Sequence, residues 1–247
     1  MKVLVVGESW FIHSIHVKGF DTFTTSKYEE GGKWLLEALK DKGMDVNYMP
    51  SHVAMDHFPY TVEELKPYDA IVLSDVGANT FLLPLATFEK SEVRPNRLEV
   101  MRRYVEEGGG LVMVGGYMSF SGIDGKARYK GTPVAEALPV NCLAEDDRVE
   151  CPEGVVAKVQ LADHPVLAGV PTKWPHFLGY NRLLPKDGAQ VIVTVASDPL
   201  VVAGTYGQGR SLAFASDCAP HWGPPEFLGW EGYKKFWVNA VRWVAGK

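Results

Sequence analysis

The chain has 247 residues, of which 46% are hydrophobic and 11% aromatic, and its formal net charge at pH 7 is -5. A chain of this length can bury a sizeable hydrophobic core. It has no basic run or stripe and no apolar run as long as a membrane span, so we expect neither nucleic acid nor a membrane as a partner. Its three cysteines are too few and too scattered for a disulfide framework, which favours a reducing, cytoplasmic setting.

The first half of the sequence alternates between predicted strands and predicted helices. The strands cover residues 2–6, 45–49, 69–74 and 111–114. The helices cover residues 29–42, a short stretch that starts with the capping box at Thr61, and residues 96–107. Residues 7–28 are predicted to form a long polar and aromatic loop. The alternation predicts a parallel sheet of flavodoxin-like order, with the first and third strands adjacent.

The second half of the sequence has a different pattern. Four strand-like runs follow one another, separated by turns at residues 197–199 and 207–209, and they cover residues 155–161, 190–196, 200–206 and 210–215. They predict an antiparallel addition that leads back to the main sheet. An amphipathic helix over residues 232–244 ends the chain. We therefore expect an α/β fold of doubly wound, mostly parallel type with this addition, in a single domain over residues 1–247.

The stretch after the strand at residues 111–114 is the most informative part of the sequence. This apolar run rises from a glycine turn and stops at Gly115-Gly116, as a buried parallel strand does. In many hydrolases and transferases of this build, a nucleophile sits on the sharp turn, or elbow, that follows such a strand. Here the turn offers Tyr117 and Ser119 and no cysteine.

In an open parallel sheet, ligands bind beyond the carboxyl ends of the strands, and this rule gathers residues that are distant in the sequence. The candidate catalytic residues are Glu8, Asp75, Tyr117 and His221. The candidate ligand-binding residues are Ser9, Trp10, His16, Lys18, Asn79, Ser119 and Asp217. A crevice lined by these side chains would be polar and aromatic, which suits a small polar metabolite or a sugar.

Several of these residues have a structural interpretation as well as a functional one. Glu8 and Asp75 could act as acid and base if their surroundings separate their pKa values, or they could simply accept hydrogen bonds from loop amides. Tyr117 could donate a proton or bind a ligand, or it could cover the end of the sheet. Cys218 lies three residues before His221, so it could be a thiolate nucleophile or a buried filler.

The sequence indicates neither a metal nor a cofactor. His13 and His16 have the spacing of two metal ligands, but no third ligand stands at a diagnostic spacing. The glycine-rich residues 207–210 join two strands and do not open a helix, so they form a hairpin turn and not a phosphate-binding loop.

The chain resembles the putative glutamine amidotransferase family of the class I glutamine amidotransferase-like superfamily. The segments that carry the resemblance are residues 7–10, 16–21, 73–79, 115–120, 163–165, 206–210 and 216–222. It implies a flavodoxin-like fold and transfer of the amide nitrogen of glutamine. The family chemistry uses an elbow cysteine, which maps onto Tyr117, and a histidine with an acid, which map onto residues 216–221.

These observations leave four functions open. The first is binding of a small polar ligand at the strand ends without glutaminase activity. The second is a hydrolase or isomerase that uses Glu8, Asp75 or His221. The third is a true amidotransferase subunit with Cys218 as nucleophile, and the fourth is an assembly protein whose aromatic C-terminal helix packs on a partner. We expect a homo-oligomer in any of these cases.

Overall fold

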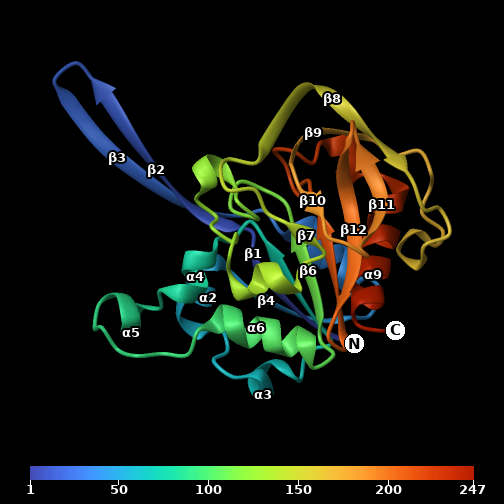
Figure 1. Cartoon of the computed structure of the whole chain (residues 1–247). Helices are drawn as coiled ribbons and strands as arrows, with labels where there is room; N and C mark the ends of the chain where they lie inside the picture. The colour runs from blue at the N-terminus through green and yellow to red at the C-terminus, as the bar shows by residue number, and fades with distance from the viewer.

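A nine-stranded sheet runs through the computed structural model, which describes residues 1–247 (Figure 1). Five neighbouring strands are parallel, in the order β4 (Asp45–Met49), β1 (Lys2–Gly7), β5 (Ala70–Ser74), β6 (Gly110–Val114) and β13 (Gly209–Phe214). The first and third predicted strands, now β1 and β5, are adjacent, so the flavodoxin-like order is confirmed.

The antiparallel addition is also confirmed. It continues the sheet beyond β13 with β12 (Asp198–Tyr206), β11 (Gln190–Val195), β8 (Arg148–Val159) and β9 (His176–Asn181). β8 begins seven residues before the predicted strand at 155–161, and β9 lies where no strand was predicted. A separate pair consists of β7 (Val140–Asn141) and β10 (Leu184–Pro185).

Helices cover both faces of the parallel strands, of which β5 and β6 are buried along their whole length as near-continuous apolar runs (Figure 1). α1 (Lys33–Lys40) packs beside α9 (Glu231–Val244), whereas α6 (Arg97–Glu106) packs with α3 (Val62–Leu65) and α7 (Pro133–Ala137). The remaining helices are α2 (Ser51–His57), α4 (Ala78–Leu82), α5 (Leu85–Phe88), α8 (Pro225–Leu228), and the short η1 (Ile123–Gly125) and η2 (Pro165–Leu167). None of them combines the length and the apolar composition that crossing a bilayer requires.

Two helix starts follow from local chemistry that is visible in the sequence. Thr61 accepts a hydrogen bond from the backbone N–H of Glu64, and the Glu64 carboxylate accepts one from the N–H of Thr61, which is the predicted capping box. Asn96 caps α6 by accepting a hydrogen bond from the N–H of Leu98 over 3.0 Å.

The long loop predicted for residues 7–28 is wrong. β2 (Ser9–Lys18) and β3 (Asp21–Glu30) pair as an antiparallel hairpin that projects from the body of the molecule (Figure 1). Burial alternates only along the first residues of β2, and nearly all of β3 is exposed, so neither strand has the fully buried face that marks a strand packed on a core. Because β3 extends to Glu30, α1 begins at Lys33 and not at the predicted residue 29.

A buried arginine joins the segments that follow β4 and β5. Arg97 is 0% exposed, and its guanidinium donates to four backbone carbonyls, those of Phe81 (2.8 Å), Ala54 (3.1 Å), Met55 (2.7 Å) and Thr80 (2.8 Å). These carbonyls belong to α2 and α4 or lie next to them. Arg97 therefore holds α2 and α4 together beside the carboxyl ends of the strands.

We predict that Arg97→Met lowers the free energy of unfolding by about 3 kcal/mol or more, because buried carbonyls lose their donors and each unsatisfied group costs about 1–3 kcal/mol. Chemical denaturation measures this loss. Arg103→Met, a change at a more exposed arginine of the same helix, is the matched control and should cost less than about 1 kcal/mol. Equal costs for the two variants would contradict the role of Arg97.

Candidate functional site

Three carboxyl groups meet at the carboxyl ends of the parallel strands, and we call Glu8, Asp75 and Asp217 the acid cluster. Glu8 follows β1, Asp75 follows β5, and Asp217 follows β13 by three residues. Glu8 and Asp217 are buried, at 1% and 5% exposure. Ser74 Oγ donates to Glu8 Oε2, and the Sγ of Cys218 lies 3.9 Å from the same oxygen.

Burial raises the pKa of every member of the acid cluster. Burial, followed by repulsion from Asp75, raises the pKa of Glu8 to about 8. Burial raises the pKa of Asp75, and burial together with Glu8 and Asp75 raises that of Asp217 well above its usual range. Like charges so close together in a dry site cannot all ionise, so the cluster holds protons at neutral pH. It can therefore both donate and accept hydrogen bonds.

The backbone at these positions adopts conformations that are rare for residues with a side chain. The φ angles of Glu8, Asp75 and His221 are 50°, 44° and 141°. Such angles cost energy and persist only where the surroundings impose them, and they are concentrated at functional sites. Here they follow three different strands at one edge of the sheet, which favours this edge as the functional site.

The elbow after β6 is bound to the acid cluster through its backbone. Asp75 Oδ1 accepts a hydrogen bond from the N–H of Met118 over 2.7 Å, and Ser119 Oγ accepts one from the N–H of Asp75 over 3.2 Å. Gly116, at φ 145°, leaves room for the Asp75 carboxylate, because a Cβ there would lie 2.9 Å from Oδ1. In enzymes with a nucleophile on this turn, the N–H of the next residue helps to bind the oxyanion. In this chain a fixed carboxyl group already binds that N–H.

Tyr117 and His221 belong to a second group, the aromatic cluster, together with Trp222, Glu150 and Arg148. The Tyr117 hydroxyl donates to Glu150 Oε1 over 3.0 Å, and Trp222 Nε1 donates to Glu150 Oε2 over 2.9 Å. The Tyr117 ring meets that of His221 edge-on at 4.4 Å and lies 4.8 Å from the Arg148 guanidinium. Burial raises the pKa of Tyr117 and lowers that of His221, so both side chains are neutral near pH 7.

The structure places the other predicted residues in three different surroundings. Ser9 Oγ accepts a hydrogen bond from the N–H of Ser51 over 2.8 Å, and Trp10 Nε1 donates to Glu29 over 3.2 Å. Ser9 and Trp10 line a cavity of about 300 Å³, and Asn79 lines another of about 440 Å³. Both cavities thus border segments that follow β1 and β5.

His16 and Lys18 are not brought to this edge. They lie far along the projecting hairpin, where the His16 ring stacks on that of Phe23 at 4.4 Å and the Lys18 ammonium lies 5.6 Å from the same ring. Of the predicted residues in the segment after β1, only Glu8, Ser9 and Trp10 lie near the carboxyl ends of the strands.

Some residues of the site escaped sequence reasoning. Asn181 of β9 donates to Asp147 over 2.7 Å and accepts from the N–H of Gly116 over 3.0 Å. These two bonds fix the elbow to the antiparallel part of the sheet. Tyr48 donates to the carbonyl of Gly7 over 3.0 Å and so supports the turn into Glu8. Ser74 could have been found, because it is the last residue of a predicted strand. The others depend on pairings between distant segments.

Glu8, Asp217 and Cys218 offer three donor atoms that lie within 4.8 Å of one another, as the ligands of a metal ion do. Metal ligands must be deprotonated. Burial raises the pKa of Cys218 well above its usual range, as it does for the two carboxyl groups, so an ion would have to displace protons from this set.

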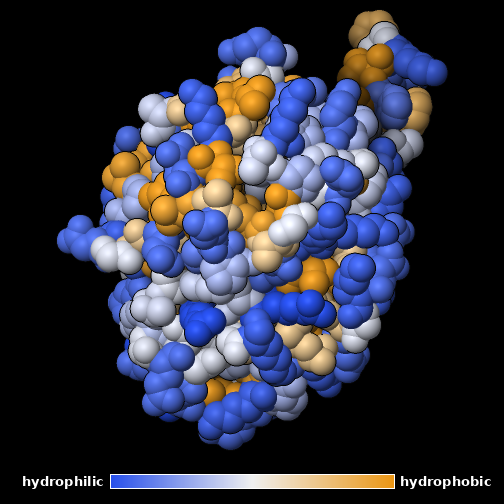
Figure 2. All heavy atoms as spheres, turned by 90° about the vertical axis from the view of Figure 1, so that its right-hand side faces the viewer, coloured by the Kyte–Doolittle hydropathy of each residue, from blue (hydrophilic) through white to orange (hydrophobic).

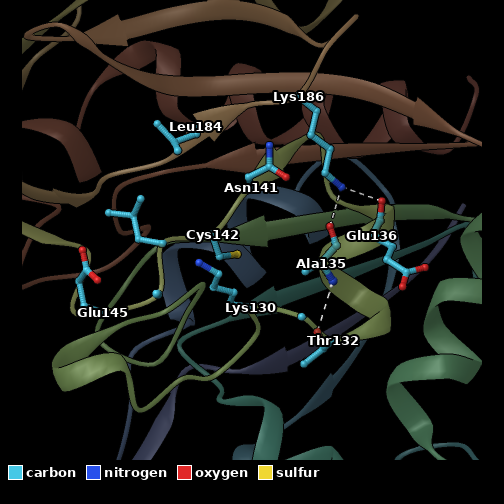
Figure 3. Close-up of a pocket in the computed structure, with 12 residues that line it drawn as sticks. Lys130, Thr132, Ala135, Glu136, Asn141, Cys142, Glu145, Leu184 and Lys186 are labelled. Carbon is cyan, nitrogen blue, oxygen red and sulfur yellow. Dashed lines mark hydrogen bonds between the residues drawn. The ribbon is translucent and has the colours of Figure 1, made fainter.

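A cavity of about 930 Å³ lies away from the acid cluster, between α7, β7 and the segment around β10 (Figure 3). The half-buried Lys186 ammonium in its wall donates to the carbonyls of Ala135 and Glu136 over 2.7 and 2.8 Å. These are carbonyls at the C-terminal end of α7, so Lys186 caps a helix there. We therefore place the candidate site at the strand ends and not in this cavity.

The sheet order and the position of the acid cluster define a flavodoxin-like α/β protein with its site at the carboxyl ends of the strands. Residues 2–246 match the model of the family described as putative glutamine amidotransferase, and the chain belongs to this family.

Two solved structures are similar over 99% of both chains, with 51% identity and a TM-score of 0.96: Cytoplasmic Protein STM3548 from Salmonella typhimurium and Cytoplasmic Protein STM1381 from Salmonella typhimurium LT2. A thua-like protein from Parabacteroides merdae shares the fold, with 16% identity, a TM-score of 0.60 and coverage of 100% of this chain and 90% of its own. A search of curated proteins gave no match.

We predict that the free energy of unfolding falls as the pH rises from 5 to 8, by up to about 1.4 kcal/mol per pH unit for each proton retained. The folded protein keeps the proton on Glu8 up to a pKa of about 8, whereas the unfolded chain releases it near the usual value. Glu8→Gln removes this proton and should flatten the slope. Urea denaturation at several pH values measures it, with the exposed Glu153→Gln as the control. An unchanged slope in Glu8→Gln would contradict the raised pKa.

Proposed function

We propose that this protein binds a small polar metabolite, such as a sugar, at the carboxyl ends of β1, β5, β6 and β13, and that it does not hydrolyse glutamine. The absence of glutamine hydrolysis is inferred from the elbow. Tyr117 stands where the family chemistry needs a cysteine, and Asp75 occupies the N–H of Met118 beside it. A neutral phenol is a poor nucleophile, and a carboxyl group on that N–H competes with the oxyanion of an acyl-transfer reaction.

Cys218 does not supply the missing thiolate. It is 1% exposed, and burial together with Glu8 and Asp217 raises the pKa of its thiol well above the usual range. Reactive cysteines instead have a lowered pKa, partial exposure and positive surroundings. The environment of Cys218 is the opposite on each count, which argues against an amidotransferase that uses this residue.

The chemistry of the edge supports a hydroxyl-rich ligand. Protonated carboxyl groups donate and accept hydrogen bonds, as the hydroxyl groups of sugars and polar metabolites require. The cavities of about 300 and 440 Å³ that Ser9 and Asn79 line are of the size that small-molecule sites have. They are lined by the segments that follow Glu8 and Asp75 and not by the acid cluster itself. The half-buried ring of Trp10 lines the cavity of about 300 Å³ and offers an apolar face to a sugar ring.

We also infer a cytoplasmic location. The two Salmonella proteins with 51% identity over 99% of their length are titled cytoplasmic proteins. The three cysteines of this chain are free and buried, as suits a reducing compartment.

We expect the purified protein to release no ammonia from glutamine above the background of a protein-free reaction. We also expect Tyr117→Cys alone to leave this unchanged, because Asp75 still binds the N–H of Met118. A coupled ammonia assay on the wild type and on Tyr117→Cys tests both expectations. Hydrolysis by the wild type that disappears in Cys218→Ala would contradict this proposal and favour the amidotransferase.

We expect at least one member of a panel of monosaccharides, sugar acids and polyols to raise the melting temperature, since a ligand at 100 times its Kd stabilises a protein by about 2.7 kcal/mol. Asp75→Asn can still accept from Met118 but cannot hold the cluster proton, so it should lose at least half of the shift. Differential scanning fluorimetry measures both effects, with Asp163→Asn in an exposed loop as control. No shift with any member of the panel would count against the ligand.

The raised pKa of Glu8 favours a second candidate, a hydrolase or isomerase. A carboxyl group with a pKa of about 8 is protonated at neutral pH and can act as a general acid, while the neutral His221 ring can accept a proton. This candidate predicts that the wild type converts a panel member that it binds. It also predicts that Glu8→Gln abolishes the conversion but keeps the thermal shift, which would favour an enzyme over a protein that only binds.

A further inference from the structure

The hairpin of β2 and β3 has no partner within the chain over most of its length. We call residues Ser9–Glu30 the arm. It stands clear of the body in Figure 1, and its end is visible above the molecule in Figure 2, with apolar side chains on it. Four large apolar residues on it are unusually open to solvent: Phe11 (54%), Ile15 (74%), Val17 (68%) and Phe20 (107%).

The two faces of the arm differ. Side chains alternate along a strand, so Phe11, Ile15 and Val17 share one face, which we call the apolar face. The residues that pair with Ile15 and Val17 are threonines, which contribute methyl groups to the same face. The other face is paired mainly within the arm, where Trp10 donates to Glu29 and Lys27 forms an ion pair with Glu29 at 2.6 Å. Its one large exposed apolar residue, Phe23, is 47% exposed and stacks on His16. On the apolar face, Phe11 packs on Tyr28 and on His52 of α2, whereas Ile15 and Val17 lie farther out and are 74% and 68% exposed.

An isolated two-stranded hairpin is marginally stable in water, so an arm of this length needs support. Nevertheless, its direction is the same in a second protein. The structure of STM3548 superposes on 99% of the chain with a TM-score of 0.96, and two ten-residue strands pointing elsewhere would lower that score. About half of the residues differ between the two proteins. A common support outside the single chain explains this agreement.

We propose that a second copy of this chain covers the apolar face, with the two arms exchanged reciprocally about a two-fold axis. A stable interface needs roughly 20–30 residues from each side, which is the size of the arm. Ten residues per strand extend about 33 Å, enough to cross a neighbouring protomer. The arm carries charges of both signs, Lys18 and Lys27 against Asp21, Glu29 and Glu30, and so has an excess of only one negative charge. This composition suits self-association better than a polyanionic partner.

Exchange of the arms would also order the candidate site. The N–H of Gly31, directly after the arm, donates to the carbonyl of Glu8, directly before it, over 2.8 Å. A Cβ at Gly31 would lie 2.7 Å from Glu8 Oε1. Both chain segments at the base of the arm therefore touch the acid cluster. A partner that holds the arm holds the backbone of Glu8 as well, whichever ligand the site binds.

Sedimentation velocity of the full chain at micromolar concentration tests this proposal. We expect the wild type to sediment at twice the 27.3 kDa of one chain, or more. Ile15→Asp with Val17→Asp should halve that mass while the far-UV circular dichroism of the body persists. The matched control, Ser14→Asp with His16→Asp, adds the same charges at the same spacing on the other face and should keep the wild-type mass.

Hydrogen exchange on the wild type provides a readout that needs no variant. Arm amides should exchange at least tenfold more slowly in the oligomer than after dilution to the monomer. A monomeric wild type at micromolar concentration would overturn the proposal. So would dissociation of both double variants alike, because it would show that the apolar face is not what binds, and so would arm amides that exchange freely in the oligomer.

Discussion

Removal of carboxyl groups from water at a single edge of the sheet, almost complete for Glu8 and Asp217 and partial for Asp75, is the constraint on which the rest of the site depends. A buried carboxyl group is stable only when it is protonated or when donors surround it. The chain uses both solutions. The pKa of Glu8 rises to about 8, and Ser74 donates to its carboxylate, while Asp75 receives the N–H of Met118. The unusual backbone angles at Glu8 and Asp75 aim these side chains inward, because each follows a strand whose end is fixed by its neighbours.

This arrangement explains how much of the fold and the site the sequence could predict. The strands β5 and β6 are apolar throughout, and glycines or polar residues bound them, so their position and parallel order follow from pattern. Strand ends converge in any such sheet, and this alone placed Glu8, Asp75 and Asp217 together. It did not predict their protonation, because a pKa depends on how closely groups pack after folding.

The failures have a physical reason as well. The sequence predicts a loop in place of the arm because the arm does not bury one face against the core of its own chain. Its β-branched and aromatic residues, with Gly19 at φ 64° between the two strands, were the available signal. Likewise Glu150 and Asn181 join the site through β8 and β9, which belong to the antiparallel addition. Such pairings link segments far apart in the sequence and leave no local pattern.

The elbow shows how the same backbone can serve different chemistry. Family chemistry with a cysteine at position 117 would leave the next N–H free for an oxyanion, whereas here Asp75 fills that place and also belongs to the acid cluster. Restoring a thiol at position 117 would therefore not restore the anion site, since the carboxyl group would have to leave the N–H of Met118. The Asp75 carboxyl group, which is half-buried, would then lose its hydrogen bond from Met118. Tyr117 and Asp75 therefore differ from the family chemistry together. With both in place, the turn no longer offers an N–H to an anion and instead fixes one carboxyl group of the acid cluster.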